Sequence, residues 1–505
     1  MQLDLARAFA FLRGARWGAA HGASALAAPG VVTGVSTDSR AITPGCLFVA
    51  LKGERFDAHA FVEQAVRDGA SAVLVNAGQS SVALGVPQIE VPDTTHALGE
   101  LAKGWRCGFR LPVIAVTGSN GKTTVKAMIA SIFEAAFGAG SFHATPGNLN
   151  NAIGVPLTLL GLRPSHRCAV VELGMNHPGE IAGLADMAQP RVALVNNAQR
   201  EHQEFMDGVA ATAHENGAVI AALPADGIAV FPADDACAPI WRALAGQRRV
   251  IDFALSAKAD ATAGDDVAVS AQTDADPCGF DLTLRGLAAQ QSGSTTVIRI
   301  ELAIAGQHNV RNALAAAACC RAIGIAPAAI VAGLAAFRPV AGRLVRQVRA
   351  DGAVVIDDSY NANPDSVRAA IDLLADLGVG SSGDEGSKTV LVLGDMGEVG
   401  SQGEAFHAEV GAWARRRGLG RLIATGDLSR FAVNAWDQIR ASPLGAADFG
   451  QSAQHCASIQ ETISAALGAT RPGTTVLVKG SRFMRMERVV HALLQTRAAE
   501  AGGHG

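Results

Sequence analysis

A glycine-bearing run with one lysine and adjacent threonines, TGSNGKTT, stands at residues 117–124. Glycines let a chain turn tightly enough for its N–H groups to face an anion, while lysine adds positive charge and a threonine hydroxyl can hold Mg2+. We therefore predict that the phosphates of a nucleotide are bound by Thr117, Gly118, Ser119, Asn120, Gly121, Lys122, Thr123 and Thr124. The common phosphate-loop spacing requires a glycine where Val116 stands, so a surface turn that happens to contain Gly-Lys-Thr is the alternative interpretation.

Two residues with metal-binding side chains, Glu172 and His202, follow short apolar runs at 168–171 and 192–195. A carboxylate suits Mg2+, whereas an imidazole is a less usual ligand for so hard a cation. The predicted metal ligands are Thr123, Glu172 and His202. The alternatives are that Glu172 caps a helix and that His202 is a surface histidine.

Amide side chains gather in two further segments. A turn-rich segment carries Asn148, Asn150 and Asn151, which could contact a polar substrate or hydrogen-bond the loop to itself. Asn309 and Asn312 are spaced to lie one helical turn apart, on one face. Such a pair could contact an adenine edge, although helix capping explains Asn309 equally well.

The apolar pattern predicts the elements that position these residues. Residues 113–116 are apolar without alternation, as expected of a strand covered on both faces of a parallel sheet. Apolar residues then recur at helical spacing from 125 to 137, which places the nucleotide phosphates at a helix N-terminus. Strand and helix patterns alternate from 109 to 338, and ligand sites in such sheets lie beyond the carboxyl ends of the strands. The predicted metal ligands are therefore expected beside Lys122.

Length and pattern divide the 505 residues into three predicted domains of the α/β class. Residues 1–108 are predicted to form a small α/β domain, in which hydroxyls beside Arg40 could bind a phosphate or simply form a polar turn. A central domain with a parallel sheet is predicted for 109–338. The predicted last domain, 339–505, has a doubly wound sheet whose strands end in charged or small residues.

Composition limits the classes of partner. Lys plus Arg number 42 and Asp plus Glu number 46, for a net charge of −4, so no basic balance points to nucleic acid or an anionic membrane. No apolar run approaches the length needed to cross a bilayer, so we expect no membrane insertion and a cytoplasmic protein. The eight cysteines include no C-x-x-C pair, which favours reduced thiols over a disulfide framework or a zinc site.

Three segments carry no predicted chemistry. We expect variable hairpins or loop at 257–296, a flexible surface insertion at 381–387 and a disordered tail at 498–505.

Several segments together resemble the Mur ligase family. They are TGSNGKTT (117–124), GNLNNAIGVPLTLL (147–160), ELGMNHPGEI (172–181), GQHNVRNALAAAA (306–318), DDSYNANPDS (357–366), VLGDMGE (392–398) and VLVKGSR (476–482). The resemblance covers nearly the whole chain and implies three domains. These are an N-terminal domain that binds a UDP-linked substrate, a central ATPase domain of the P-loop type, and a C-terminal Rossmann-like domain that closes over the site.

The reaction implied by the resemblance is an ATP-dependent ligation that releases ADP and phosphate. The best match within the family joins D-alanyl-D-alanine to UDP-N-acetylmuramoyl-tripeptide through an acyl phosphate, in peptidoglycan precursor synthesis. ATP and Mg2+ are the implied cofactors, and we expect a monomer. The alternatives are another amide ligase with the same core, either the one that adds the third peptide residue or folylpolyglutamate synthase, or a nucleotide switch without ligase activity.

The resemblance also implies roles for single residues. The catalytic residues would be Lys122, Glu172, His202 and Arg343. Nucleotide contacts beyond the phosphate loop would come from Asn309 and Asn312 to adenine, Asp358 to the ribose and Arg343 to the γ-phosphate. The UDP group would be held by Ser36, Ser39 and Arg40, and the UDP-linked substrate would also contact Asn148, Asn150 and Asn151. The incoming dipeptide would be placed by Tyr360, Asn361, Asn363, Lys479, Ser481 and Arg482.

One position departs from the family pattern. Many relatives carry a lysine after the histidine loop that becomes carbamylated and helps to hold a metal, and the matching position is Asn216. An amide cannot form a carbamate, so we expect Glu215 or Glu204 to supply the missing charge, or a second metal to be held more weakly. Added CO2 is then predicted not to rescue activity lost at low bicarbonate.

Overall fold

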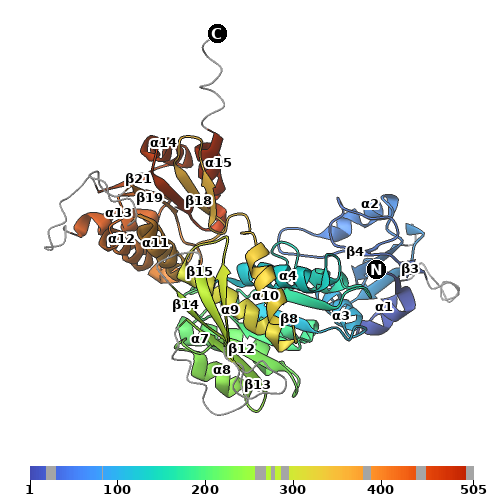
Figure 1. Cartoon of the computed structure of the whole chain (residues 1–505). Helices are drawn as coiled ribbons and strands as arrows, with labels where there is room; N and C mark the ends of the chain where they lie inside the picture. Colours follow the sequence, from blue (N-terminus) through green and yellow to red (C-terminus); the bar gives the residue numbers. More distant parts are fainter. Residues whose placement is uncertain are drawn as a thin grey trace, which may run out of the picture.

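A computed structural model describes residues 1–18, 30–81, 84–255, 269–273, 279–285, 295–378, 388–439 and 451–495. The chain forms three α/β domains, and the N-terminal and C-terminal domains both border the central one (Figure 1). The predicted α/β class with three domains is confirmed. The boundaries at 108/109 and 338/339 stay predictions, and the segments 381–387 and 498–505 lie outside the described residues.

The N-terminal domain contains a five-stranded sheet with the order β2-β7-β6-β5-β4. Its strands are β2 (Arg16–Trp17), β4 (Val35–Ser36), β5 (Leu47–Val49), β6 (Ala72–Asn76) and β7 (Gln88–Val91), and only β2 runs antiparallel. A separate pair joins β1 (Leu3–Asp4) to β3 (Val31–Val32). The helices are α1 (Leu5–Phe11), α2 (Val62–Arg67) and α3 (Thr94–Arg106), with a 3-10 turn at Ala58–Phe61.

Helix α3 joins this domain to the central one. Its apolar residues, Leu98 and Leu101 among them, belong to one buried cluster that also contains residues of the N-terminal sheet and of the central domain. Polar side chains at the end of the helix extend the same contact, because Trp105 Nε1 donates to the Leu162 carbonyl and Arg106 Nε to that of Ala188. The two domains therefore share a hydrophobic core.

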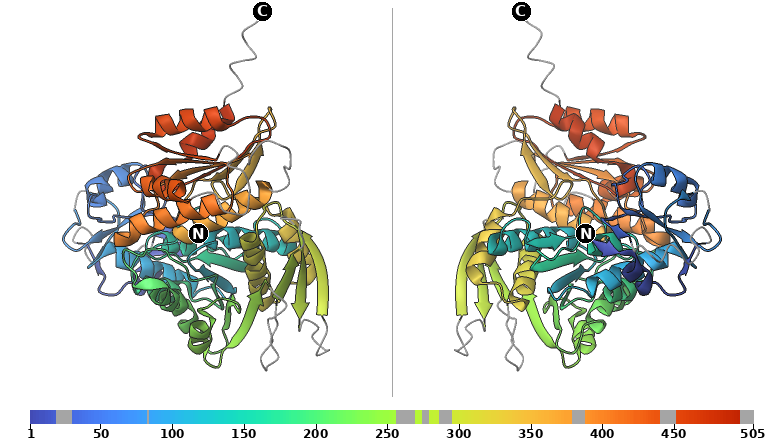
Figure 2. Two further views of the ribbon diagram at one scale, coloured as in Figure 1. Left: turned by 90° about the vertical axis from the view of Figure 1, so that its left-hand side faces the viewer. Right: turned by 90° about the vertical axis from the view of Figure 1, so that its right-hand side faces the viewer.

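The central domain is built on a nine-stranded sheet with the order β16-β15-β14-β13-β12-β11-β8-β10-β9. Its strands are β8 (Val113–Thr117), β9 (Phe142–Ala144), β10 (Cys168–Glu172), β11 (Val192–Val195), β12 (Ile228–Pro232), β13 (Arg249–Ala254), β14 (Val269–Thr273), β15 (Gly279–Arg285) and β16 (Thr295–Glu301). Pairing is parallel from β9 to β14 and antiparallel from β14 to β16, so the described part of 257–296 contains hairpin strands. These strands lie at the edge of the sheet (Figure 2, yellow-green).

Helices cover both faces of the central sheet. They are α4 (Lys122–Phe137), α5 (Gly154–Leu160), α6 (Glu180–Ala188), α7 (Gly208–Ala221), α8 (Ala238–Ala245), α9 (Gln307–Ala322) and α10 (Pro327–Ala336). Along β8, Val113 and Ala115 belong to one buried cluster, whereas Ile114 and Val116 belong to the other. This double burial explains why the strand is apolar at every position rather than at alternate ones.

The C-terminal domain has a six-stranded sheet with the order β17-β18-β22-β19-β20-β21, in which only β17 is antiparallel. The strands are β17 (Val345–Val348), β18 (Val354–Asp358), β19 (Thr389–Gly394), β20 (Arg421–Thr425), β21 (Ser452–Cys456) and β22 (Thr475–Lys479). The helices are α11 (Pro364–Gly378), α12 (Gly403–Arg416), α13 (Ser429–Gln438), α14 (Ile459–Ala469) and α15 (Glu487–Gln495). Two separate apolar clusters cover the two faces, as in a doubly wound fold.

The C-terminal domain meets the central one mainly through polar contacts. Arg200, in the loop after β11, binds Asp365 of α11 and Glu409 of α12 at 2.6 Å each. Leu344, in the linker between the two domains, packs against apolar clusters of both. In the described ranges, no helix has the length and apolar character required to span a membrane.

Candidate active site

The loop between β8 and α4 has the conformation expected of a phosphate-binding loop. Gly118 and Gly121 adopt positive φ angles of 126° and 84°, which favour glycine. A Cβ on Gly121 would overlap the side-chain amides of Asn312 and Asn196, so this position also requires a residue without a side chain. Gly121 directly precedes α4, and the loop therefore presents the N-terminus of a long helix, where an anion is favoured.

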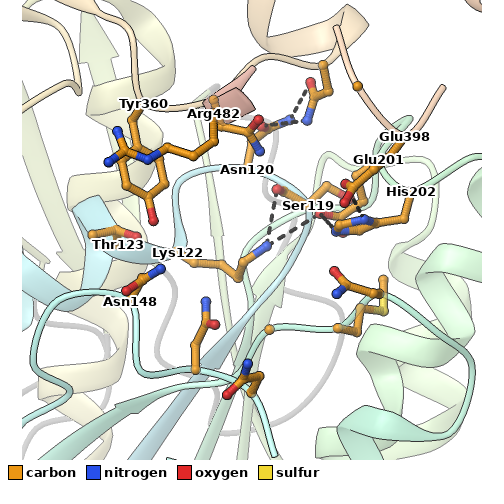
Figure 3. Close-up of a pocket in the computed structure, with 18 of the residues that line it drawn as sticks. Ser119, Asn120, Lys122, Thr123, Asn148, Glu201, His202, Tyr360, Glu398 and Arg482 are labelled. Carbon is orange, nitrogen blue, oxygen red and sulfur yellow. Dashed lines mark hydrogen bonds and ion pairs between the residues drawn. The ribbon is translucent and has the colours of Figure 1, made fainter. Parts of the chain in front are cut away.

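Lys122 lies over this loop. Its Nζ donates to the carbonyls of Gly118 and Ser119 and lies 3.4 Å from a carboxylate oxygen of Glu201 (Figure 3). The lysine therefore lies beside the predicted phosphate loop, and its contact with a phosphate stays a prediction.

Glu172 ends strand β10 with its side chain almost fully buried. Oε1 accepts hydrogen bonds from Thr123 Oγ1 at 3.2 Å and from Asn150 Nδ2 at 2.9 Å. Oε2 lies 3.1 Å from the ammonium of Lys126 without a hydrogen bond to it. Because α6 begins at Gly179 and Glu180, Glu172 is a strand-end carboxylate rather than a helix cap.

These residues fit a bound Mg2+. The Thr123 hydroxyl and the Glu172 carboxylate are adjacent oxygen groups of the kind that Mg2+ prefers, and one buried carboxylate oxygen has no hydrogen-bond donor. The described residues contain no cluster of three or more His, Cys, Asp or Glu able to hold a metal by themselves. The remaining ligands would have to come from nucleotide phosphates and water, which is the usual way Mg2+ is held beside phosphates.

His202 lies in the loop after β11, with a φ of 48°. Its Nδ1 is 2.7 Å from Glu398 Oε2 in the C-terminal domain, and its Nε2 is 3.8 Å from Glu201 Oε2. The pKa of the Glu398 carboxyl is lowered, chiefly by this His202 ring. His202 is thus not a free surface histidine, because it contacts a carboxylate of the C-terminal domain.

A cavity of about 510 Å3 brings most of the predicted residues together. From the central domain it is lined by Ser119, Asn120, Gly121, Lys122, Thr123, Asn148, Asn150, Asn151, Glu172 and His202. From the linker and the C-terminal domain it is lined by Arg343, Tyr360, Asn361, Asn363, Lys479 and Arg482. Figure 3 shows Tyr360 and Arg482 on one side of Lys122, and Glu201, His202 and Glu398 on the other.

A second cavity of about 620 Å3 begins at the same loop and is bordered by Thr124, Asn309, Asn312 and Asp358. Asn312 donates to Asn309 Oδ1 at 3.1 Å and accepts from Asn196 Nδ2 at 2.9 Å, which fixes both amides. Neither amide caps α9, whose N-cap is Gly306. Burial lowers the pKa of His308 in the same cavity to about 4, so this ring is neutral at pH 7.

Six predicted residues line neither cavity; they are Thr117, Gly118, Ser36, Ser39, Arg40 and Ser481. Thr117 and Gly118 fix the start of the loop, since the Thr117 hydroxyl and the Gly118 N–H both donate to Asn216 Oδ1. Arg40 is exposed and pairs with Asp38, whose pKa it lowers to about 2. The Ser481 hydroxyl is buried and donates to the Ala362 carbonyl.

The carboxylate beside Asn216 is neither of the two expected to compensate for the missing charge. Glu215 accepts from the backbone N–H groups of Gly179 and Ile181, and Glu204 contacts the C-terminal domain through its backbone N–H. The Asn216 amide instead donates to buried Glu201 at 3.3 Å. The expectation for Glu215 and Glu204 is therefore corrected, since the carboxylate that lies here is Glu201.

Sequence reasoning missed Glu201, Lys126 and Arg200. Lys126 follows Lys122 by four residues and so shares its helix face, a spacing that could have revealed it. Glu201 and Arg200 precede His202 directly in the chain, but their partners lie on other elements. Nothing in the local sequence identifies those partners.

The fold and the site together define a nucleotide-binding enzyme of three domains, with a site that lies between the central and C-terminal domains. Family models match along the chain: a Mur ligase middle domain at 116–320, a Mur ligase glutamate ligase domain at 342–482, and a Mur ligase family catalytic domain at 31–106. The chain belongs to the Mur ligase family. Members of this family are ATP-dependent ligases, so the predicted family and enzyme class are confirmed.

Individual relatives are similar to this chain over nearly its whole length. The chain is 40% identical over 461 residues to UDP-N-acetylmuramoyl-tripeptide--D-alanyl-D-alanine ligase of Escherichia coli K12, covering 91% of this chain and 93% of the relative. It is similar to a crystal structure of MurF from Acinetobacter baumannii, with a TM-score of 0.81, 30% identity and coverage of 98% and 99%. MurF of Thermotoga maritima in complex with ADP shares the fold, with a TM-score of 0.71, 23% identity and coverage of 91% and 96%.

Proposed function

We propose that this enzyme joins D-alanyl-D-alanine to UDP-N-acetylmuramoyl-tripeptide, with conversion of ATP to ADP and phosphate. The observation that carries the proposal is the shared cavity, in which Lys122, Thr123 and Glu172 face Arg343 and Arg482 from the C-terminal side. The groups that this proposal assigns to phosphate and to carboxylate thus border one cavity. The named relatives, which cover nine-tenths of the chain, support the choice of substrates.

The chemistry requires activation of a carboxylate, because its oxygen is a poor leaving group towards an amine. Transfer of the γ-phosphoryl group of ATP to the tripeptide carboxylate gives an acyl phosphate, and the amine of the dipeptide then displaces phosphate. In this proposal Lys122 and Arg343 neutralise the phosphoryl oxygens during transfer. Thr123 and Glu172 would hold Mg2+, which offsets charge on the transferred group when bound.

The other predicted contacts complete the proposal. Asn309 and Asn312 would face adenine and Asp358 the ribose. Asn148, Asn150 and Asn151 would contact the UDP-linked substrate, and Ser36, Ser39 and Arg40 its UDP group. Tyr360, Asn361, Asn363, Lys479, Ser481 and Arg482 would place the dipeptide, with two of these acting indirectly. Those two are Lys479, which is 2.6 Å from Asp358, and Ser481, which donates to Ala362.

His202 would act near a second metal in this proposal, with Glu201 as the closest carboxylate of the central domain. ATP and UDP-linked precursors are cytoplasmic compounds, so we place the reaction in the cytoplasm, catalysed by a monomer. Size-exclusion chromatography with light scattering would test the monomer.

Phosphate release tests the proposed reaction. The enzyme should release phosphate from ATP only when both the UDP-tripeptide and D-alanyl-D-alanine are present, with one peptide product formed for each phosphate. Omission of either substrate is the control. Turnover of ATP alone, without product, would favour a nucleotide switch instead. Substitution of other amino acids for the dipeptide distinguishes the other amide ligases, and variants of the tripeptide identify its third residue.

Lys122→Ala should abolish product formation, because the phosphoryl group loses a cation that the proposal assigns to its transfer. Binding of the UDP-tripeptide, measured by calorimetry, should remain largely intact since the lysine is assigned to ATP. An equal loss of binding and ligation would contradict this separation of roles.

A further inference from the structure

Tyr360 is the only tyrosine of the chain, and the guanidinium groups of two arginines of the cavity lie near its ring. The guanidinium carbon of Arg343 is 4.2 Å from the centre of the Tyr360 ring, and that of Arg482 is 5.6 Å away. Both distances lie within the range of about 6 Å in which a cation is attracted to an aromatic ring. Figure 3 shows the ring beside Arg482, with its hydroxyl end directed towards Thr123.

Tyr360 also fixes the backbone that carries Arg343. Its N–H donates to the Gly342 carbonyl at 3.2 Å, and the Arg343 N–H closes a turn onto Val340 at 3.0 Å. Gly342 has a φ of 72°, and a Cβ there would lie 3.1 Å from Tyr360 Cβ. The linker turn and the guanidinium of Arg343 are therefore both held by the same residue.

Arg343 has no ion-pair partner among the described residues, and the ion pair of Arg482 is a long one. Arg343 Nε is buried without a hydrogen-bond partner, and no carboxylate among the described residues forms an ion pair with this side chain. The Arg482 side chain is 67% exposed, and the carboxylate paired with it, that of Glu487, is 3.8 Å from the guanidinium. Two cations held near one ring, in a cavity that also contains Lys122, form a site for anions rather than a structural ion pair.

We propose that Tyr360 is a positioning residue that holds Arg343 for the transferred phosphoryl group and Arg482 for the free carboxylate of the incoming dipeptide. The aromatic face keeps two like charges close together before their anions arrive, since its negative quadrupole attracts each of them. The inference rests on the proposed function and adds a residue that connects its two substrates.

Kinetics of single and double variants test the proposal. Tyr360→Leu removes the ring, whereas Tyr360→Phe retains it and loses only the hydroxyl. We expect kcat/KM for ATP and for the dipeptide to be about tenfold lower in Tyr360→Leu than in Tyr360→Phe, the size of a partly desolvated cation–π contact. The difference for ATP should disappear in an Arg343→Ala background, and the difference for the dipeptide in an Arg482→Ala background.

Two results would overturn the proposal. If Tyr360→Leu costs the same factor in every background, the ring has only a structural role. If Tyr360→Phe is as impaired as Tyr360→Leu, the hydroxyl matters and the ring does not. Phe137→Leu is the matched control, because it removes a ring 4.3 Å from Arg167 at the far end of α4 and should leave all constants unchanged. Thermal melting of each variant verifies folding. Tyr360→Phe keeps the aromatic ring and its packing.

A spectroscopic measurement separates this inference from the proposed function. Incorporation of 3-fluorotyrosine gives a single 19F resonance, because the chain has one tyrosine. The resonance should shift when AMP-PNP and Mg2+ are added, and the shift should be lost in Arg343→Ala. A resonance that does not respond, or responds equally in Arg343→Ala, contradicts the positioning role. Failure of ligation with an intact, Arg343-dependent shift would instead contradict the proposed reaction.

Discussion

Glu172 combines three contacts in one buried carboxylate: a hydroxyl, an amide and an ammonium group. Glu172→Gln keeps the shape and removes the charge. We expect phosphate release to fall by about 100-fold, the scale of losing one electrostatic contact to a transition state, and the Mg2+ requirement to rise. The measurement is phosphate release across a Mg2+ titration, with exposed Glu134→Gln on α4 as the control. An unchanged Mg2+ dependence would mean that Glu172 does not hold the metal.

Asn216 leads to a prediction about carbon dioxide. Its amide is buried between the phosphate loop and Glu201, and an amide does not form a carbamate. Removal of CO2 and bicarbonate from the buffer should leave the rate unchanged, and 13C-bicarbonate should produce no carbamate signal in NMR spectra. Restoration of activity by added bicarbonate would contradict this expectation.

At the scale of elements, the loop after β11 serves two domains. Asn196 and Asn197 donate to the carbonyl of Asn120 in the phosphate loop, whereas Arg200 and His202 reach the C-terminal domain. A change in one loop can therefore affect both the nucleotide site and the contact between domains.

The carboxylates on the C-terminal side of this contact predict its dependence on pH. The pKa of Glu409 is lowered, chiefly by hydrogen bonds from Arg200, and that of Glu398 chiefly by His202. Because the pKa of each glutamate is lower in the docked state, its charge stabilises docking at pH values above the ordinary pKa of 4.5. This contribution is lost as the pH falls from 4.5 through the lowered pKa. Small-angle scattering should show separation of the domains in acid and no change between pH 6 and 8.

An unchanged radius of gyration down to the onset of unfolding would contradict this prediction. Arg200→Gln provides the comparison, because docking without the Arg200 contacts should depend less steeply on pH.

Much of the central site could be predicted from the sequence because its residues lie at the ends of apolar strands or in the loops that follow them. Glu172 ends β10 and Lys122 follows the loop after β8; the two strands are neighbours in the sheet, so parallel pairing brings both residues to the same edge. Glu201 could not be predicted as the neighbour of Asn216, since the backbone path of a loop is set by contacts distant in the chain. The segment around Arg40 has the hydroxyls and the arginine expected of a phosphate site, but Arg40 forms an ion pair with Asp38 instead.

At the scale of the whole molecule, Arg200 links the central and C-terminal domains through ion pairs with Asp365 and Glu409. Arg200→Ala should lower kcat by about tenfold, because charge-assisted hydrogen bonds contribute about 1.5–3 kcal/mol each and the closed cavity needs both domains. Steady-state kinetics with both substrates saturating provide the measurement. Arg13→Ala, which removes an exposed ion pair with Glu100 in the N-terminal domain, is the control and should not change kcat.

The shared core around α3 has a practical consequence for dividing the chain. A fragment that begins at Val113 would leave α5 and α6 without their apolar cover, so we expect it to be insoluble when expressed alone. A fragment of residues 1–338 retains that cover. A fragment of residues 339–505 loses the polar contacts of Arg200 and His202, but its apolar packing changes at Leu344. We expect these two pieces to be produced separately as folded proteins, and heteronuclear NMR spectra would establish whether they are.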